Sequence, residues 1–351
     1  MRSFEELVST AAAARASDIH ICTGYAPSMR LHGDIRPIVE GALTAEEAQS
    51  IAYSILNDVR KETLKTKGEV DFAYTCSGTR MRCNVYHEGG NVALAVRLLS
   101  KGVPAFNTLG LPPGLLEMCD KKRGLILVTG ITGSGKSTTL ASIVQEINNR
   151  HDYHILTIEE PVEYIYDKGR SLINQREVGS DSTSFASCLR AALRQDPDVI
   201  LLGEMRDSET ISTAISAAET GHLVLSTLHT VSAAGAVDRI IDSFNPHQQQ
   251  QIRSQLAEAL EVVVSQQLIP RADGAGRVVA CEVMFCNNAV RSLIREGKTY
   301  QIPNTMLTSK KQGMQLMDDA IYDLYARGKI SADNAVKFAQ DREIMGRKVI
   351  I

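Results

Sequence analysis

The chain lacks any apolar run close to the roughly 18 residues needed to span a bilayer. It also lacks a signal peptide, because Glu5 and Glu6 interrupt the N-terminal segment and no apolar run follows. Its seven cysteines form no C-x-x-C pair, so the sequence suggests neither a zinc ribbon nor a dithiol redox motif. Scattered thiols are typical of a reducing compartment. The sequence therefore predicts a cytoplasmic protein that reaches a membrane only through partners.

An excess of charge is absent too, since 38 basic and 41 acidic residues give a net charge of −3. No stretch interleaves basic with aromatic residues, which weighs against a nucleic-acid translocase and against direct nucleic-acid binding. The composition, 44% hydrophobic and 23% charged, is typical of a folded globular protein. A length of 351 residues fits two domains.

The sequence pattern predicts an α/β protein with a domain boundary near residue 100. Residues 1–100 alternate short helical and strand patterns and form a small α+β domain, and residues 101–112 read as a linker with Pro and Gly. Residues 113–351 form the second domain. Continuous apolar runs there predict strands buried on both faces of a parallel sheet, with helices as crossovers. These runs are Leu125–Thr129, His154–Glu159, Val199–Leu202 and Leu223–Ser226.

The C-terminal part of the second domain is predicted to be mostly helical. Asn245 and Pro246 suit a helix start, and an apolar stripe of Ile252, Leu256, Leu260 and Val263 continues from it. A strand at 277–285 interrupts the helices.

The strongest motif is Gly130-Ile-Thr-Gly-Ser-Gly-Lys-Ser137, a complete phosphate-binding P-loop after a strand and before a helix. Glycines let backbone amides surround phosphates, Lys136 supplies a positive charge, and the Ser137 hydroxyl binds Mg²⁺. The sequence therefore predicts a site for ATP and Mg²⁺. The predicted nucleotide-binding residues of this loop are Gly130, Thr132, Gly133, Ser134, Gly135, Lys136, Ser137 and Thr138.

An acidic residue follows the apolar strand 199–202, in the manner of a Walker B strand. Gly203 stands where a Mg²⁺-associated aspartate is expected, and Glu204 comes next. Glu204 is therefore predicted to orient or deprotonate the attacking water and to lie near the metal. The alternative is a solvated carboxylate at a strand end.

Two further segments follow predicted strands. Glu160 and Glu163 crowd a strand end with Glu159, and a Mg²⁺-nucleotide centre would relieve their repulsion. Glu160 is a predicted metal neighbour, and an acidic loop facing water is the alternative. His229 ends the strand that begins near His222, and it is placed to sense the γ-phosphate.

Four ordered motifs together resemble the secretion and type IV pilus ATPases (the GspE/PilT superfamily). They are the P-loop GITGSGKST, the acidic box ILTIEEPVEY, the Walker B segment DVILLGEMRD and the histidine box TGHLVLSTLHT. The segment 289–298, AVRSLIREGK, resembles the AIRNLIREGK signature of the pilus retraction subfamily, with Val290 and Ser292 departing from it. An ordinary amphipathic helix is the alternative reading of this segment.

The resemblance implies a homohexamer whose subunits each have a PAS-like N-terminal domain and a RecA-like ATPase domain. It implies ATP hydrolysis that drives pilus disassembly, retraction and twitching motility. It places the protein at the inner face of the cytoplasmic membrane, on a PilC-like platform protein and with a PilU-like ATPase as a further partner. Arginines would reach the phosphates, and the candidates are Arg80, Arg82, Arg97, Arg194 and Arg206.

Other functions remain open at this level. A PilU-like accessory retraction ATPase or a secretion or extension ATPase shares the four motifs, although extension ATPases carry extra N-terminal domains and a tetracysteine zinc module that this sequence lacks. A nucleotide-gated scaffold subunit that does not hydrolyse ATP would keep the P-loop. The presence of Glu204 argues against that scaffold.

Overall fold

The computed structural model describes residues 3–31, 33–99 and 102–349. It divides into two compact units. The first contains residues 1–102 and 161–165, and the second contains 103–160 and 166–351. The predicted boundary and linker start, residues 100 and 101, lie outside the described residues.

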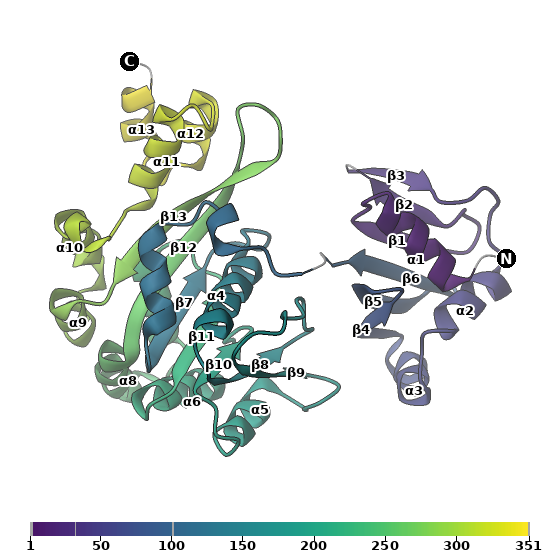
Figure 1. The fold of residues 1–351 in the computed structure, drawn as a ribbon, viewed down its shortest axis with the longest axis horizontal. Helices are drawn as coiled ribbons and strands as arrows, with labels where there is room; N and C mark the ends of the chain where they lie inside the picture. Colours follow the sequence, from purple (N-terminus) through teal and green to yellow (C-terminus); the bar gives the residue numbers. More distant parts are fainter. Residues whose placement is uncertain (1–2, 32, 100–101, 350–351) are drawn as a thin grey trace. The chain divides into compact units, whose positions relative to one another are not determined.

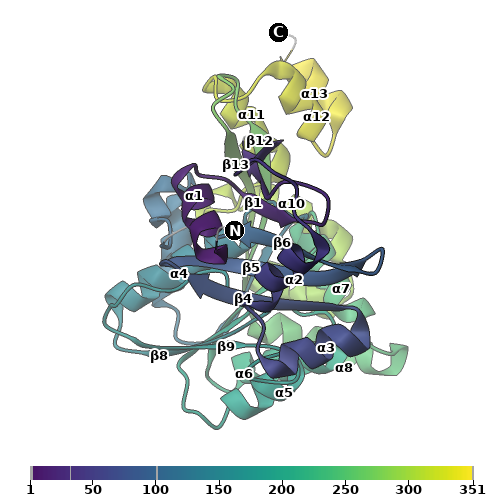
Figure 2. The same cartoon turned by 90° about the vertical axis from the view of Figure 1, so that its right-hand side faces the viewer.

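The first unit is a six-stranded sheet in the order β3-β2-β1-β6-β5-β4, and each neighbouring pair is antiparallel (Figures 1 and 2). The helices α1, α2 and α3 share a hydrophobic core with alternate residues of the strands. The elements are α1 (Phe4–Ala13), β1 (Asp18–Ile21), β2 (Ser28–Leu31), β3 (Asp34–Pro37), α2 (Ala45–Tyr53), α3 (Asp58–Lys67), β4 (Glu69–Cys76), β5 (Thr79–Glu88) and β6 (Asn91–Leu98).

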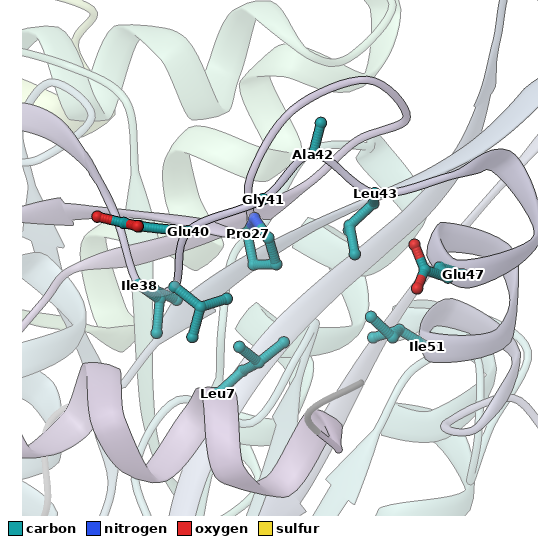
Figure 3. A pocket seen from close by; sticks show the side chains of 10 residues that line it. Leu7, Pro27, Ile38, Glu40, Gly41, Ala42, Leu43, Glu47 and Ile51 are labelled. Atoms are coloured by element: carbon teal, nitrogen blue, oxygen red, sulfur yellow. The ribbon is translucent and has the colours of Figure 1, made fainter.

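Local sequence explains the helix starts of this unit. The hydroxyls of Ser3 and Thr44 accept the backbone amides of Glu6 and Glu47. In return, the backbone amides of Ser3 and Thr44 donate to the carboxylates of these glutamates, so α1 and α2 both begin with a capping box. A pocket of about 610 Å³ lies between these helices and the segment 38–43 (Figure 3). Most of its lining residues have apolar side chains, and the carboxylates of Glu40 and Glu47 also line it.

The second unit is built on a seven-stranded sheet in the order β13-β12-β7-β11-β10-β8-β9. All neighbouring strands are parallel except β12 and β13. The strands are β7 (Gly124–Thr129), β8 (His154–Glu159), β9 (Leu172–Glu177), β10 (Val199–Leu202), β11 (Leu223–Leu228), β12 (Leu260–Pro270) and β13 (Arg277–Phe285). The α/β fold class predicted from the sequence is confirmed.

Helices cover both faces of this sheet (Figure 1). Leu125 and Leu127 of β7 pack with α5 to α9, whereas Ile126 and Val128 pack with α4 and the 3₁₀ helices before β7. The helices are η1 (Phe106–Thr108), η2 (Pro113–Asp120), α4 (Lys136–Arg150), α5 (Phe185–Ala192), α6 (Ser208–Glu219), α7 (Ala233–Asp242), α8 (Pro246–Ala259), α9 (Asn288–Arg295), η3 (Thr299–Gln301), α10 (Ile302–Thr308), η4 (Lys310–Gln312), α11 (Met317–Ala326), α12 (Ala332–Phe338) and α13 (Arg342–Val349).

One prediction for this unit is wrong. The apolar stripe assigned to a single helix through Val263 ends as a helix at Ala259, and Leu260 begins β12. The run Val262–Val264 is β-branched and fully buried, and it pairs with Ile126–Val128 of β7 in parallel register. Burial on both faces of a sheet favours such a run over continued helix.

Every helix in the described ranges is too short or too polar to cross a lipid bilayer.

Candidate functional site: the phosphate loop and the Glu204 cluster

The P-loop connects the buried strand β7 to the start of α4, as predicted. Its glycines Gly130, Gly133 and Gly135 have φ of +145°, +78° and +92°. A Cβ atom on Gly130 would lie 2.4 Å from the backbone oxygen of Gln266 and 2.5 Å from Ser134 Oγ. Only glycine fits at this point, so the chain can turn tightly enough to direct its amides into the loop.

Lys136 is the first residue of α4 and is only 8% exposed. Its ammonium group donates to the backbone oxygens of Gly130 at 2.8 Å and Ile131 at 3.1 Å. The N-cap, Gly135, has no side chain to accept the first-turn amides of α4. A buried positive charge and open helix amides at one point form a site suited to phosphate groups.

The remaining predicted residues of the loop differ in their exposure to solvent. Thr132 and Ser137 are exposed and Thr138 is half-buried, whereas Ser134 is buried. The Ser134 hydroxyl has no hydrogen-bond partner within the described part of the chain.

One residue that supports this loop is not predicted from the sequence. Gln266 of β12 is 1% exposed, and its Nε2 donates to the backbone oxygen of Ser134 at 2.7 Å. Next to it, the hydroxyls of Thr129 and Ser265 are 2.7 Å apart. The signal was the pair of adjacent glutamines, 266 and 267, within a run of apolar residues. This pair indicates a buried polar residue near the loop only when the segment is known to be a strand beside β7.

Four predicted catalytic residues meet at the carboxyl ends of β8, β10 and β11. Glu204 is central, with a side chain only 16% exposed. One of its oxygens forms an ion pair with Arg206, and the other lies 3.5 Å from His229 Nε2. Arg206 also lies 3.9 Å from a carboxylate oxygen of Glu160. We call these four residues the Glu204 cluster.

Backbone contacts fix the position of this cluster. The amide of Gly203 donates to Ile158 O at 2.8 Å, and Thr227 Oγ1 donates to Gly203 O at 2.6 Å. Gly203 also leaves little room, because an added Cβ would lie 3.3 Å from Ile158 O. The hydrogen bond with the Glu204 carboxylate raises the pKa of Arg206, so its charge is secure.

The other predicted arginines are found outside this cluster. Arg194 is exposed beyond the end of α5, and no ion pair of its side chain is found among the described residues. Arg97 pairs with Asp18 at 3.0 Å, and Arg82 pairs with Asp71 at 3.6 Å, both in the first unit.

The acidic box is divided between the units. Glu160 belongs to the second unit, whereas the half-buried Glu163 belongs to the first. In the first unit Arg80 Nε donates to the backbone oxygen of Val162 at 3.4 Å, beside Glu163. His222 lies away from the Glu204 cluster, at the opposite end of β11, where its Nδ1 is 3.0 Å from Ala217 O.

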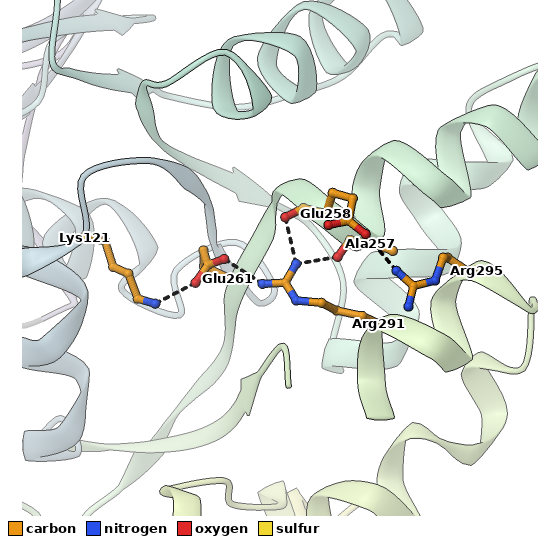
Figure 4. A network of polar contacts seen from close by, with 6 residues as sticks. All are labelled: Lys121, Ala257, Glu258, Glu261, Arg291 and Arg295. Carbon is orange, nitrogen blue, oxygen red and sulfur yellow. Dashed lines mark hydrogen bonds and ion pairs between the residues drawn. The ribbon is translucent and has the colours of Figure 1, made fainter. Parts of the chain in front are cut away.

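Most of the segment 289–298 lies in the amphipathic helix α9 (Asn288–Arg295), whose two arginines differ in setting (Figure 4). Arg291 is 17% exposed and donates to the backbone oxygens of Ala257 and Glu258 at the end of α8. It also donates to Glu261 Oε1 at 2.6 Å, and Lys121 binds the other oxygen of that carboxylate at 2.7 Å. Arg295 is 42% exposed and pairs with Glu258. The hydrogen bonds and ion pair of Arg291 therefore stabilise the packing of α9 against α8 and β12.

A metal cage made by protein side chains alone is absent from residues 3–31, 33–99 and 102–349, where no group of three or more His, Cys, Asp or Glu could hold an ion.

Comparison with known proteins gives a consistent result. A family model described as "Type II/IV secretion system protein" matches residues 1–336. A "Twitching motility protein" of Neisseria gonorrhoeae is 44% identical over 93% of this chain and 87% of its own length. The "Type IV pilus retractation ATPase PilT" of Pseudomonas aeruginosa is 43% identical over 94% of this chain and 96% of its own.

A solved structure shares the fold over nearly the whole length. The crystal structure of "the Pilus Retraction Motor PilT and Bound ADP" superposes with a TM-score of 0.93 at 45% identity, covering 99% of this chain and 100% of its own. With the family model, the two relatives and this structure in agreement, the chain belongs to the Type II/IV secretion system protein family.

Proposed function

We propose that this chain is an ATPase motor that retracts a type IV pilus. Two relatives and one solved structure carry names of twitching motility or pilus retraction, and that structure holds ADP. The observation that carries the proposal is the second unit's own geometry. The loop with Lys136 follows β7, and Glu204 follows β10, with β11 alone between these strands in one parallel sheet. In open α/β sheets, ligands bind at this edge.

The residues present suit Mg·ATP. The amides of residues 130–138 and the Lys136 ammonium would hold the phosphates. The Ser137 hydroxyl would be the direct protein ligand of Mg²⁺, with Glu160 and Glu204 nearby. When bound, Mg²⁺ supplies charge neutralisation at the β- and γ-phosphate oxygens.

Within this proposal Glu204 positions the attacking water. A general base must lie within hydrogen-bond reach of the water that it activates, so the placement of its oxygens matters for the reaction. Arg206 forms an ion pair with one oxygen of Glu204, and His229 Nε2 lies 3.5 Å from the other. Arg206 would also bring positive charge to the transferring phosphoryl group, as would Arg194 and the first unit's Arg80, Arg82 and Arg97 on assembly.

The assembly and its partners belong to the same proposal. Six copies would form a ring, with the first unit's arginines and Glu163 completing the nucleotide site. The ring would act in the cytoplasm on an inner-membrane platform protein of the PilC kind, alone or with a PilU-like ATPase. ATP and ADP would favour different packings of the units, and that difference in affinity is the source of mechanical work.

The test compares two carboxylates five positions apart. Glu204→Gln should keep nucleotide binding and lose phosphate release. Glu209→Gln is the matched control, because Glu209 is 62% exposed and pairs with Arg190 at the surface. Near-normal phosphate release by Glu204→Gln would reassign the water-positioning role. Absence of phosphate release from the unaltered chain with Mg·ATP would leave a nucleotide-gated scaffold instead of a motor.

A cellular experiment separates retraction from extension. Deletion of the gene should give long, abundant pili and abolish twitching, whereas loss of an extension ATPase would give cells without pili. If pili stay retractile after the deletion, an accessory role beside another retraction ATPase would replace the one proposed.

A further inference from the structure

The second unit contains a buried carboxylate outside the Glu204 cluster. Glu282 lies on the edge strand β13 and is only 4% exposed. Burial raises its pKa, and hydrogen bonds from backbone amides oppose this effect. A carboxylate removed from water is costly unless it is hydrogen-bonded, so its partners identify what it does.

Both of its oxygens are occupied by the starts of helices. Oε1 accepts the amide of Ala233, the first residue of α7, at 2.6 Å. Oε2 accepts the amide of Met317, the first residue of α11, at 3.4 Å. The N-cap residue of α11 is Leu316, whose side chain cannot accept a hydrogen bond. A negative charge at two helix N-termini is favourable for both.

On one side Glu282 is connected to the C-terminal helices. Residue 315 pairs with Val283 of β13 through two backbone hydrogen bonds, of 2.8 and 3.0 Å. Asp318, in the first turn of α11, accepts the amides of Gln340 and Asp341 at 2.7 and 2.9 Å. These bonds join α11 to the start of α13, so α11, α12 and α13 are tied together and to β13.

On the other side Glu282 is connected to the histidine box. Ala233 begins α7, and the loop 229–232 immediately before it carries His229. The same loop is reached a second time, because Gln340 Nε2 donates to the backbone oxygen of Val231 at 3.5 Å. His229 at the start of this loop contacts Glu204.

We propose that Glu282 is a positioning residue that fixes the His229 loop, and through His229 the Glu204 carboxylate, to the C-terminal helices α11–α13. The inference rests on the proposed ATPase function. It adds to that function a connection through which a mechanical force on α11–α13 alters the rate of ATP hydrolysis. The loop is not part of the P-loop, so Glu282 acts on the hydrolytic step and leaves nucleotide affinity to Lys136 and the glycines.

Two substitutions in the full chain test this role. Glu282→Gln keeps the side-chain length but offers one acceptor, so one of the two helix amides loses its partner. Glu282→Asp keeps the charge and both acceptors but is one methylene shorter. Both should lower kcat for ATP hydrolysis by about fivefold or more, with KM changed less than about twofold.

The matched control loosens the same helices without touching Glu282. Ser331 caps α12 by accepting the amide of Asn334 at 3.2 Å, and Ser331→Ala removes that bond. It should lower thermal stability and leave kcat unchanged. Equal losses of kcat in Ser331→Ala and Glu282→Gln would mean that the effect is one of general stability.

A double-mutant cycle provides the deciding readout. In a His229→Ala background, Glu282→Gln should cause no further loss of kcat, because the residue through which it acts is gone. Full additivity, or unchanged kcat in Glu282→Gln alone, would overturn the positioning role. An unaltered chain without ATPase activity would instead overturn the proposed function. Hydrogen exchange over residues 229–236 gives a second check, since faster exchange is expected in Glu282→Gln and unchanged exchange would contradict the role.

Discussion

Removal of Arg291 is predicted to destabilise the second unit before it affects any partner. The guanidinium holds two backbone oxygens at the C-terminus of α8 and one oxygen of Glu261 (Figure 4). Arg291→Ala leaves the carboxylate of Glu261, 20% exposed, with Lys121 as its remaining partner among the described residues. Two carbonyl oxygens at a helix end lose a charged donor at the same time.

The size of the effect follows from this setting. Arg291 is largely withdrawn from water, but Glu261 keeps one ion pair, so the loss falls below that of a fully buried pair. We estimate about 2 kcal/mol, which for a unit of this size is a fall in melting temperature of about 4–8 °C. Arg291→Lys keeps the charge without the fork of donors and should lose roughly half as much.

The assay is thermal unfolding followed by circular dichroism, because the chain contains no tryptophan for a fluorescence measurement. Arg295→Ala is the control. Arg295 is 42% exposed and pairs with a Glu258 side chain that is 66% exposed, so its loss should cost less than about 1 kcal/mol. If Arg291→Ala melts with the unaltered protein, or if Arg295→Ala melts equally early, the assignment of Arg291 to the fold is refuted.

Three further outcomes are expected. Lys136→Ala should abolish ATP binding measured by calorimetry, and undiminished binding would refute the assignment of the P-loop as the nucleotide site. Gly130→Ala should also lose nucleotide binding, because the added Cβ would lie 2.4 Å from the backbone oxygen of Gln266. A Cβ added at Gly133 has no atom within 4 Å, so Gly133→Ala should bind nucleotide more strongly than Gly130→Ala. Burial alone would raise the pKa of Asp18, but hydrogen bonds from Ser17 and Arg97 outweigh this effect and leave the pKa lowered. The Asp18 carboxylate therefore stabilises the fold above about pH 4, and this stabilisation is lost as the pH falls through the pKa of Asp18 in the folded state. Urea unfolding of Asp18→Asn should show a smaller loss of stability on acidification than the unaltered chain, and identical pH dependence would contradict this.

The parts of the fold that sequence could predict were those fixed by local pattern. The strands at 154–159, 199–202 and 277–285 have the predicted bounds, because each is a short apolar run with clear ends. The capping box at Thr44 was also readable, since its chemistry involves residues only three apart. Such features depend on neighbours in the chain and not on the tertiary structure.

The parts that sequence missed depend on distant partners. Helix α3 buries only Leu64, so it has no apolar stripe to reveal it. Strand β9 is a mixed polar segment at the edge of the sheet, held by its pairing with β8. The end of α8 at Ala259 is set by the pairing of the following residues with β7, more than a hundred positions away.

The residues of the candidate site also fall into those that local sequence predicts and those that depend on distant partners. The P-loop was readable because its strand, loop and helix are contiguous. The grouping of Glu204, Arg206, His229 and Glu160 was foreseeable, because the carboxyl ends of parallel strands share one edge. The contributions of Gln266 and Glu282 were not, since each is a buried polar side chain whose partners belong to elements far away in sequence.

Strand β12 has a mechanical consequence. It pairs with β7 over residues 260–265 on one edge and with β13 over residues 262–270 on the other. A force directed along this strand is therefore shared by many interstrand bonds in shear, and it does not peel them apart one by one. Strand β7, which leads into the phosphate loop, and strand β13, which precedes the last helices, are thus joined through β12 by continuous interstrand hydrogen bonding. A displacement of β13 is therefore transmitted to the base of the phosphate loop.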